Sequence, residues 1–144
     1  MNGIVVVDDE PVDYASMLCL DSPGGTELNY HIFRSGRAVL RVLPSLCGQS
    51  VPISLCLINT RLPDMSGFDL LQMLHTYLNS HSRGVMVGSN YCVEDERAAR
   101  QYGAAFYICK PLQKEWFDRI GSDSVQHSRD SGSGSVLSGH GGAR

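Results

Sequence analysis

The sequence lacks any long apolar run and any recognisable leader. No stretch approaches the roughly 20 apolar residues that a membrane-spanning helix needs. The amino terminus reaches the acidic residues 8–10 after only a few apolar residues and has no basic lead-in, unlike a targeting signal. We therefore expect a protein of the cytoplasm that makes no contact with a membrane.

Clusters of basic or metal-binding side chains are missing too. The 12 Lys and Arg residues are scattered and the net charge is -3, which argues against a nucleic-acid-binding surface. The five cysteines are odd in number and show no C-x-x-C spacing, and the five histidines are dispersed, so neither a disulfide framework nor a zinc site is indicated. Cys56 and Cys109 fall inside apolar runs, where a small buried hydrophobic role is the simplest interpretation.

The length and the composition along the chain indicate one domain and a tail. A chain of 144 residues is long enough for one compact core and too short for two ordinary domains. Residues 121–144 hold 13 Gly or Ser among 24 and offer too few apolar side chains for a core. We predict a folded domain over residues 1–121 and a flexible Gly/Ser-rich tail or linker over 122–144.

Short β-branched runs alternate with amphipathic segments along the domain. The patterns predict strands at 4–7, 30–33, 53–58, 85–87 and 106–109. They predict helices at 12–20, 37–46, 68–78 and 93–102, and a fifth helix that holds Trp116, Phe117 and Ile120. Five strands alternating with five helices predict an α/β fold with a doubly wound parallel sheet and helices on both faces.

Polar residues follow several of these strands. In a five-stranded sheet of order 2-1-3-4-5, the functional crevice lies outside the carboxyl ends of strands one and three. Asp8 and Asp9 follow the first strand, Asn59 follows the third, and Lys110 follows the fifth. The pattern therefore places two carboxylates and an amide together, with the lysine nearby.

Three stretches, VVVDDEP, LCLINTRLPDMSGFDLL and GAAFYICKP, resemble the receiver domain of two-component response regulators. The similarity covers residues 3 to about 120, and the motifs occur in the right order at strand ends. The resemblance implies the flavodoxin-like (βα)5 fold and a signalling role rather than an enzyme.

The resemblance also implies roles for single residues. Asp8 and Asp9 match the acid pair that holds Mg²⁺, and Arg61 matches the residue whose backbone carbonyl also binds the metal. Lys110 matches the lysine that pairs with the phosphate, and Asn59 stands at the position of the phosphate-accepting aspartate. An amide cannot take a phosphoryl group as a carboxylate does, and with two carboxylates in place of three we expect at most weak Mg²⁺ binding.

The switch positions of the family show a second departure. Counting back from Lys110 without a gap puts Gly88 where the family has a phosphate-sensing Thr or Ser, whereas a one-residue slip would put Ser89 there. Tyr107 matches the aromatic switch position, three residues before the lysine. The loss of the phosphate-accepting aspartate and the loss of the phosphate-sensing hydroxyl would be consistent with each other, because a receiver that is never phosphorylated needs no hydroxyl to sense the phosphate.

We therefore expect an atypical receiver that acts as a phosphorylation-independent protein-interaction domain. The expected partners are a histidine kinase, an output domain or another signalling protein. The family uses the face of the fourth helix, fifth strand and fifth helix for partners and for homodimers, and Tyr91, Tyr102 and Tyr107 belong near it.

Two other functions stay open at this stage. The chain could still be phosphorylated on Asp9 or Asp64, or on Asn59 after deamidation. A flavodoxin-like ligand-binding protein or a phosphatase is a more remote alternative. The DDEP loop after the first strand repels anions, and its adjacent aspartates differ from the alternating ones that a haloacid-dehalogenase-type phosphatase needs.

Overall fold

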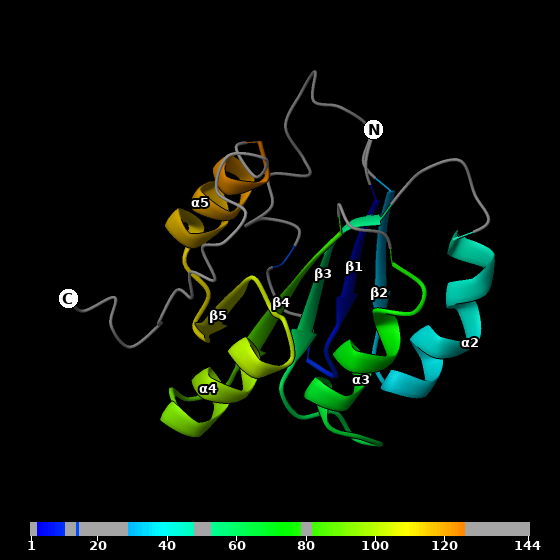
Figure 1. The fold of residues 1–144 in the computed structure, drawn as a ribbon, viewed down its shortest axis with the longest axis horizontal. Coiled ribbons are helices and arrows are strands. Elements are labelled where there is room, and N and C mark those ends of the chain that lie inside the picture. Colours follow the sequence, from blue (N-terminus) through cyan, green and yellow to red (C-terminus); the bar gives the residue numbers. More distant parts are fainter. Residues whose placement is uncertain (1–2, 11–13, 15–28, 48–52, 79–81, 126–144) are drawn as a thin grey trace.

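The computed structural model describes residues 3–10, 14, 29–47, 53–78 and 82–125. Its sheet has five parallel strands in the order β2-β1-β3-β4-β5 (Figure 1). The strands are β1 (Gly3–Val7), β2 (Asn29–Phe33), β3 (Ile53–Asn59), β4 (Arg83–Gly88) and β5 (Phe106–Cys109). The predicted fold class and strand order are confirmed.

Both faces of the sheet are covered, which explains why its central strands read as unbroken apolar runs. Successive side chains of a strand point to opposite faces. Val5 and Val7 of β1 therefore pack with one set of helices, whereas Ile4 and Val6 pack with the other. All four side chains are buried, and two separate cores result.

Helices α2 (Gly36–Cys47), α3 (Gly67–Leu74) and α4 (Val93–Gln101) lie on one face, and α5 (Lys114–Val125) lies on the other (Figure 1). Among the helices, α2 and α3 supply most of the buried side chains of the first core, for example Leu43 and Leu71. The second core receives three buried side chains of α5, as the sequence pattern predicts: Trp116, Phe117 and Ile120. Among the described helices, none is long and apolar enough to cross a membrane.

The ends of two helices differ from the prediction by several residues, and two predicted segments lie largely outside the described residues. Helix α3 ends at Leu74 and not at residue 78, because the chain then tightens into turns in which Thr76 and Tyr77 bond carbonyls three residues back. Helix α5 continues to Val125, past the predicted domain boundary at residues 121 and 122. The predicted first helix lies outside the described residues except for the helical Tyr14, and so does the predicted tail beyond Val125.

Candidate functional site

The carboxyl ends of β1, β3 and β5 bring the predicted pocket residues to one edge of the sheet. Asp8 directly follows β1, Asn59 is the last residue of β3, and Lys110 directly follows β5. Asp8 is fully buried and Asn59 is 6% exposed, so neither is a solvated strand-end residue. We call Asp8, Asn59, Lys110 and the Arg61 carbonyl the acid pocket.

Asp8 has donors on both of its carboxylate oxygens. Its Oδ2 accepts a hydrogen bond from the Tyr14 hydroxyl at 2.8 Å and lies 2.9 Å from the Lys110 ammonium. Its Oδ1 accepts from the backbone N–H of Glu10 at 2.8 Å. A buried carboxylate is tolerated only when it is paired and hydrogen-bonded, and these three donors meet that need.

Tyr14 is a pocket residue that the sequence pattern did not single out, because it lies in a segment interpreted only as a helix. Its ring belongs to the second core and its hydroxyl reaches the strand end. An aromatic hydroxyl six residues after a buried acid is the signal that could have found it.

Asn59 uses its amide nitrogen inside the turn that follows β3. Its Nδ2 donates to the backbone carbonyl of Arg61 at 2.9 Å, and this is the carbonyl matched to a metal ligand in the family. Its Oδ1 is buried and has no hydrogen-bond partner among the described residues. The amide therefore holds the β3–α3 turn, at the cost of one unsatisfied acceptor.

The β3–α3 turn is held by close backbone packing. Thr60 donates its N–H to the Val87 carbonyl at 2.8 Å and accepts from the Gly67 N–H at 2.8 Å. A Cβ at Gly67 would overlap the carbonyl oxygen of Asn59, so only glycine fits there. The Ser66 hydroxyl caps α3 by accepting from the Phe68 N–H. These contacts hold the turn without a carboxylate at position 59.

The two acids considered as alternative acceptors lie in different surroundings. Asp9 is exposed, unlike its neighbour Asp8. Asp64 is exposed too, but its two oxygens accept from the backbone N–H groups of Gly36 and Arg37 at 3.0 and 2.8 Å. Asp64 therefore caps the start of α2, and these bonds, that of Arg37 first, lower its pKa.

Gly88 at the end of β4 lies close to Tyr107 of the neighbouring strand β5. Gly88 ends β4 and pairs with Cys109, whereas Ser89 is exposed. Tyr107 is fully buried, and its hydroxyl accepts from the Cys92 N–H at 3.2 Å and donates to the Asn90 carbonyl at 3.4 Å. Burial raises the pKa of Tyr107, so the phenol stays neutral.

The three tyrosines expected at a partner face divide into two groups. Tyr107 contributes nothing to an exposed face, because its side chain is fully buried. Its hydroxyl bonds the β4–α4 loop. Tyr91 and Tyr102 are half-buried. Tyr91 packs beside Tyr107 and bonds Glu96, whereas Tyr102 packs on Phe68 with ring centroids 5.6 Å apart.

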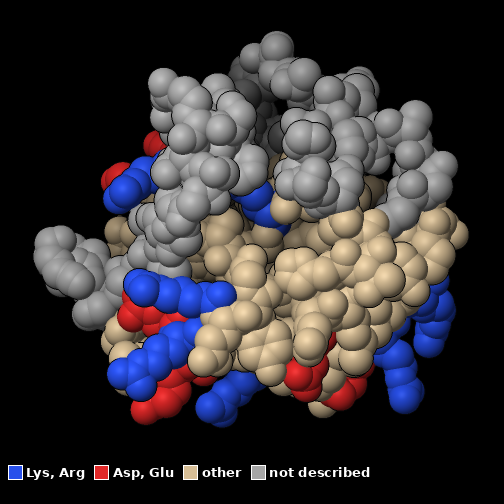
Figure 2. Space-filling view, in the orientation of Figure 1, with Lys and Arg blue, Asp and Glu red and all other residues tan. Residues whose placement is uncertain are grey.

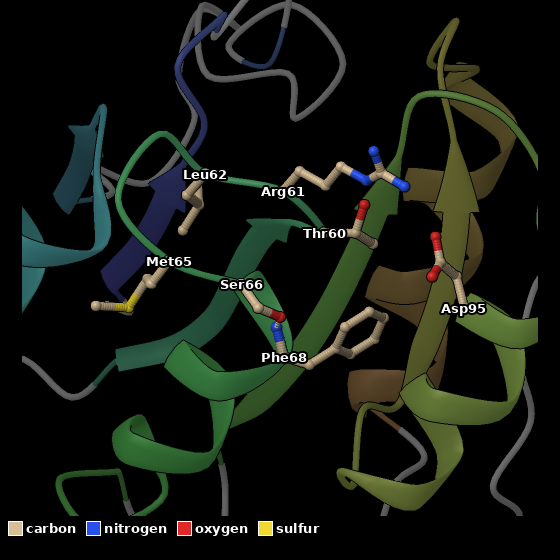
Figure 3. Close-up of a pocket in the computed structure, with 7 residues that line it drawn as sticks. All are labelled: Thr60, Arg61, Leu62, Met65, Ser66, Phe68 and Asp95. Carbon is tan, nitrogen blue, oxygen red and sulfur yellow. Dashed lines mark hydrogen bonds between the residues drawn. The ribbon is translucent and has the colours of Figure 1, made fainter.

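A pocket of about 430 Å³ opens between the β3–α3 turn and the start of α4 (Figure 3). Its floor is partly apolar, and the side chains of Arg61, Phe68 and Asp95 point toward it. On the molecular surface, basic and acidic side chains interleave where Figure 1 places α4, without a patch of one sign (Figure 2).

The comparisons with known proteins agree with this geometry. The structure is similar to a CheY-like response regulator receiver domain protein of Methanospirillum hungatei, with TM-score 0.68, 22% identity and coverage of 90% of this chain and 98% of that one. It is equally similar to the signal receiver domain of an HD domain-containing protein of Pseudomonas fluorescens, with TM-score 0.68, 21% identity and coverage of 90% of each chain. Both likenesses concern the fold.

A curated relative extends the likeness to sequence. The "Probable cyclic di-GMP phosphodiesterase" of Vibrio cholerae is 30% identical over 112 residues, which cover 76% of this chain and 23% of that protein. The chain thus spans about a quarter of the length of this relative. The family model for the response regulator receiver domain matches residues 4–119. This chain therefore belongs to the response regulator receiver domain family, whose members are signalling modules of two-component systems.

Proposed function

We propose that this receiver domain works without aspartyl phosphorylation, as a protein-interaction domain held in one conformation. The observation that carries the proposal is Asn59, a buried amide at the end of β3. An amide nitrogen has a delocalised lone pair and its oxygen carries no full charge, so Asn59 cannot act as a phosphoryl acceptor as a carboxylate does.

The hydrogen bonding of Asn59 supports a structural role in place of a chemical one. Its nitrogen is committed to the Arg61 carbonyl within the turn that leads to α3. The ammonium of Lys110, which pairs with phosphate in the family, lies 2.9 Å from Asp8 instead. Each of these two polar groups thus has a partner within the protein, and neither contact requires a phosphoryl group.

The other acids of the region are poor substitutes for an acceptor. Both oxygens of Asp64 bond the first N–H groups of α2, so phosphorylation there would remove a helix cap. Asp9 is exposed and lies outside the buried network around Asp8.

The position of Tyr107 supports a single conformation of the β4–α4 loop. Its hydroxyl contacts both Asn90 and Cys92 of that loop and lies beside Gly88, where no side chain competes for the space. On this proposal the surface of α4, β5 and α5 is presented to a partner without a phosphate signal. The partner is a histidine kinase, an output domain, another signalling protein or a second copy of this chain, with Tyr91 and Tyr102 near the contact.

Phosphorylation can be tested directly. The full chain is incubated with acetyl phosphate and Mg²⁺, and its intact mass is measured beside that of Asn59→Asp as a positive control. We expect no added phosphate on the parent and an acid-stable, base-labile phosphate on the variant. Such a phosphate on the parent would contradict the proposal, and peptide mapping would then show whether Asp9, Asp64 or a deamidated residue 59 carries it.

A further inference from the structure

We infer that the donors of this chain close the acid pocket to Mg²⁺: the amide of Asn59 faces the Arg61 carbonyl and the ammonium of Lys110 faces Asp8, two of the oxygen sources that a metal ion would use. The inference rests on the proposed function only in that both depend on an amide at position 59. Within the described residues, no group of three His, Cys, Asp or Glu side chains is placed to hold a metal ion.

The first oxygen that already accepts a hydrogen bond is the backbone carbonyl oxygen of Arg61. Asn59 Nδ2 lies 2.9 Å from it and directs an N–H toward the oxygen. The positive end of that N–H group occupies the approach that a cation would take. With aspartate at this position, the same place would hold an acceptor oxygen and a negative charge, both of which favour a cation.

Asp8 is the second oxygen source that is already used. Its Oδ2 faces the Lys110 ammonium and the Tyr14 hydroxyl, and its Oδ1 faces the Glu10 N–H. Mg²⁺ demands near-octahedral geometry with oxygens at about 2.0–2.1 Å. An ion that approached Asp8 Oδ2 this closely would have to displace Lys110 and leave the ammonium beside a divalent cation, which is electrostatically unfavourable. An ion at Oδ1 would meet the Glu10 N–H that already bonds this oxygen.

The charge of the buried network leads to the same conclusion. Asp8 is fully buried and Lys110 is largely buried, so one negative and one positive charge cancel, while Asp9 is exposed. Among the buried side-chain oxygens and nitrogens of the described residues, only Asn59 Oδ1 has no hydrogen-bond partner, and it belongs to a neutral amide. A single hydrogen-bond donor would satisfy that oxygen, and Mg²⁺ prefers anionic oxygens.

The test compares Mg²⁺ binding by the parent chain and by Asn59→Asp, with titration calorimetry and melting temperature at constant ionic strength. We expect no heat of binding and no change in melting temperature for the parent up to about 10 mM Mg²⁺. The variant should bind at least about tenfold more tightly, because it gains a carboxylate and loses the competing N–H. Equal affinities of the two proteins would overturn the inference.

A measurement on the parent alone keeps the inference testable if Asn59→Asp folds poorly. The side-chain NH₂ signals of Asn59 in a ¹⁵N-labelled sample report its bond to the Arg61 carbonyl. We expect these signals to stay unchanged when Mg²⁺ is added, and a saturable shift would overturn the inference. A parent that gains phosphate while these signals stay unchanged would contradict the proposed function and leave the closed pocket intact.

Discussion

The hydroxyl of Tyr107 lies 3.0 Å from the point that a Cβ on Gly88 would occupy. At this distance even a methyl group at position 88 would crowd the hydroxyl, which also bonds Asn90 and Cys92. The missing side chain of Gly88 and the buried position of Tyr107 are therefore two parts of one arrangement.

Gly88→Ala should destabilise the domain through this contact. Overpacking of a filled site costs about 1–3 kcal/mol. Part of this cost is offset because alanine gives the unfolded chain less conformational entropy than glycine does. We therefore expect the free energy of unfolding in urea to fall by about 1 kcal/mol. In a Tyr107→Phe background, which lacks the hydroxyl, the same substitution should cost at least about 0.5 kcal/mol less. Equal costs in both backgrounds would refute the coupling.

Tyr107→Phe by itself should loosen the β4–α4 loop. It removes the acceptor for the Cys92 N–H and the donor to the Asn90 carbonyl, and we expect a loss of about 1 kcal/mol in the free energy of unfolding. The Cys92 amide should also exchange its hydrogen faster. Tyr102→Phe is the matched control, because it keeps the ring that packs on Phe68, and it should change stability by less than about 0.5 kcal/mol. Unchanged exchange at Cys92 would show that Tyr107 does not hold the loop.

The strands and the location of the pocket were predictable from local patterns. Continuous apolar runs such as those of β1 and β3 indicate strands buried on both faces. The carboxyl ends of parallel strands meet at one edge, so the order of the strands along the chain was enough to place Asp8, Asn59 and Lys110 together.

The contacts within the site could not be predicted in this way. The bonds from Asn59 to Arg61 and from Tyr14 to Asp8 depend on the directions in which individual side chains point. The periodicity of strands and helices does not predict these directions. The bond from Gly36 to Asp64 joins residues 28 positions apart, so no local sequence pattern predicts it. The burial of Tyr107 depends on space left by Gly88 on a neighbouring strand.

Asp64→Ala should destabilise α2 in a pH-dependent way. The carboxylate accepts from the Gly36 and Arg37 N–H groups, and loss of such a cap costs about 1 kcal/mol at neutral pH. Because these bonds lower the pKa of Asp64 in the folded state, its contribution is present above the unfolded pKa of about 4 and is lost as the pH falls through the folded pKa. The stability difference between parent and variant should therefore shrink in acid.

Asp118→Ala is a suitable control for this pH dependence. Asp118 is an exposed acid of α5 whose carboxylate bonds the Lys114 ammonium and caps no helix. Urea unfolding from about pH 7 to pH 3 should show less than about 0.5 kcal/mol of difference from the parent at each pH. A stability loss of Asp64→Ala that is independent of pH would argue against the cap.

Lys110→Met should destabilise the domain more than Lys114→Met, because it leaves the buried Asp8 without its counter-charge. Removing one partner of a buried pair costs about 3–5 kcal/mol, and the Tyr14 and Glu10 donors that remain reduce this to about 2–3 kcal/mol. Lys114→Met removes an exposed partner of Asp118 and should cost less than about 1 kcal/mol.

The reason for the loss is testable by a second change at Asp8. If the cost of Lys110→Met comes from an unpaired buried charge, Asp8→Asn should cost less in that background than in the parent, since it removes the charge that lacks a partner. Denaturant unfolding of the two single variants and the double variant gives the coupling energy, which we expect to exceed about 1 kcal/mol. Additive losses would mean that Lys110 stabilises the domain by the packing of its side chain and not by its pairing with Asp8.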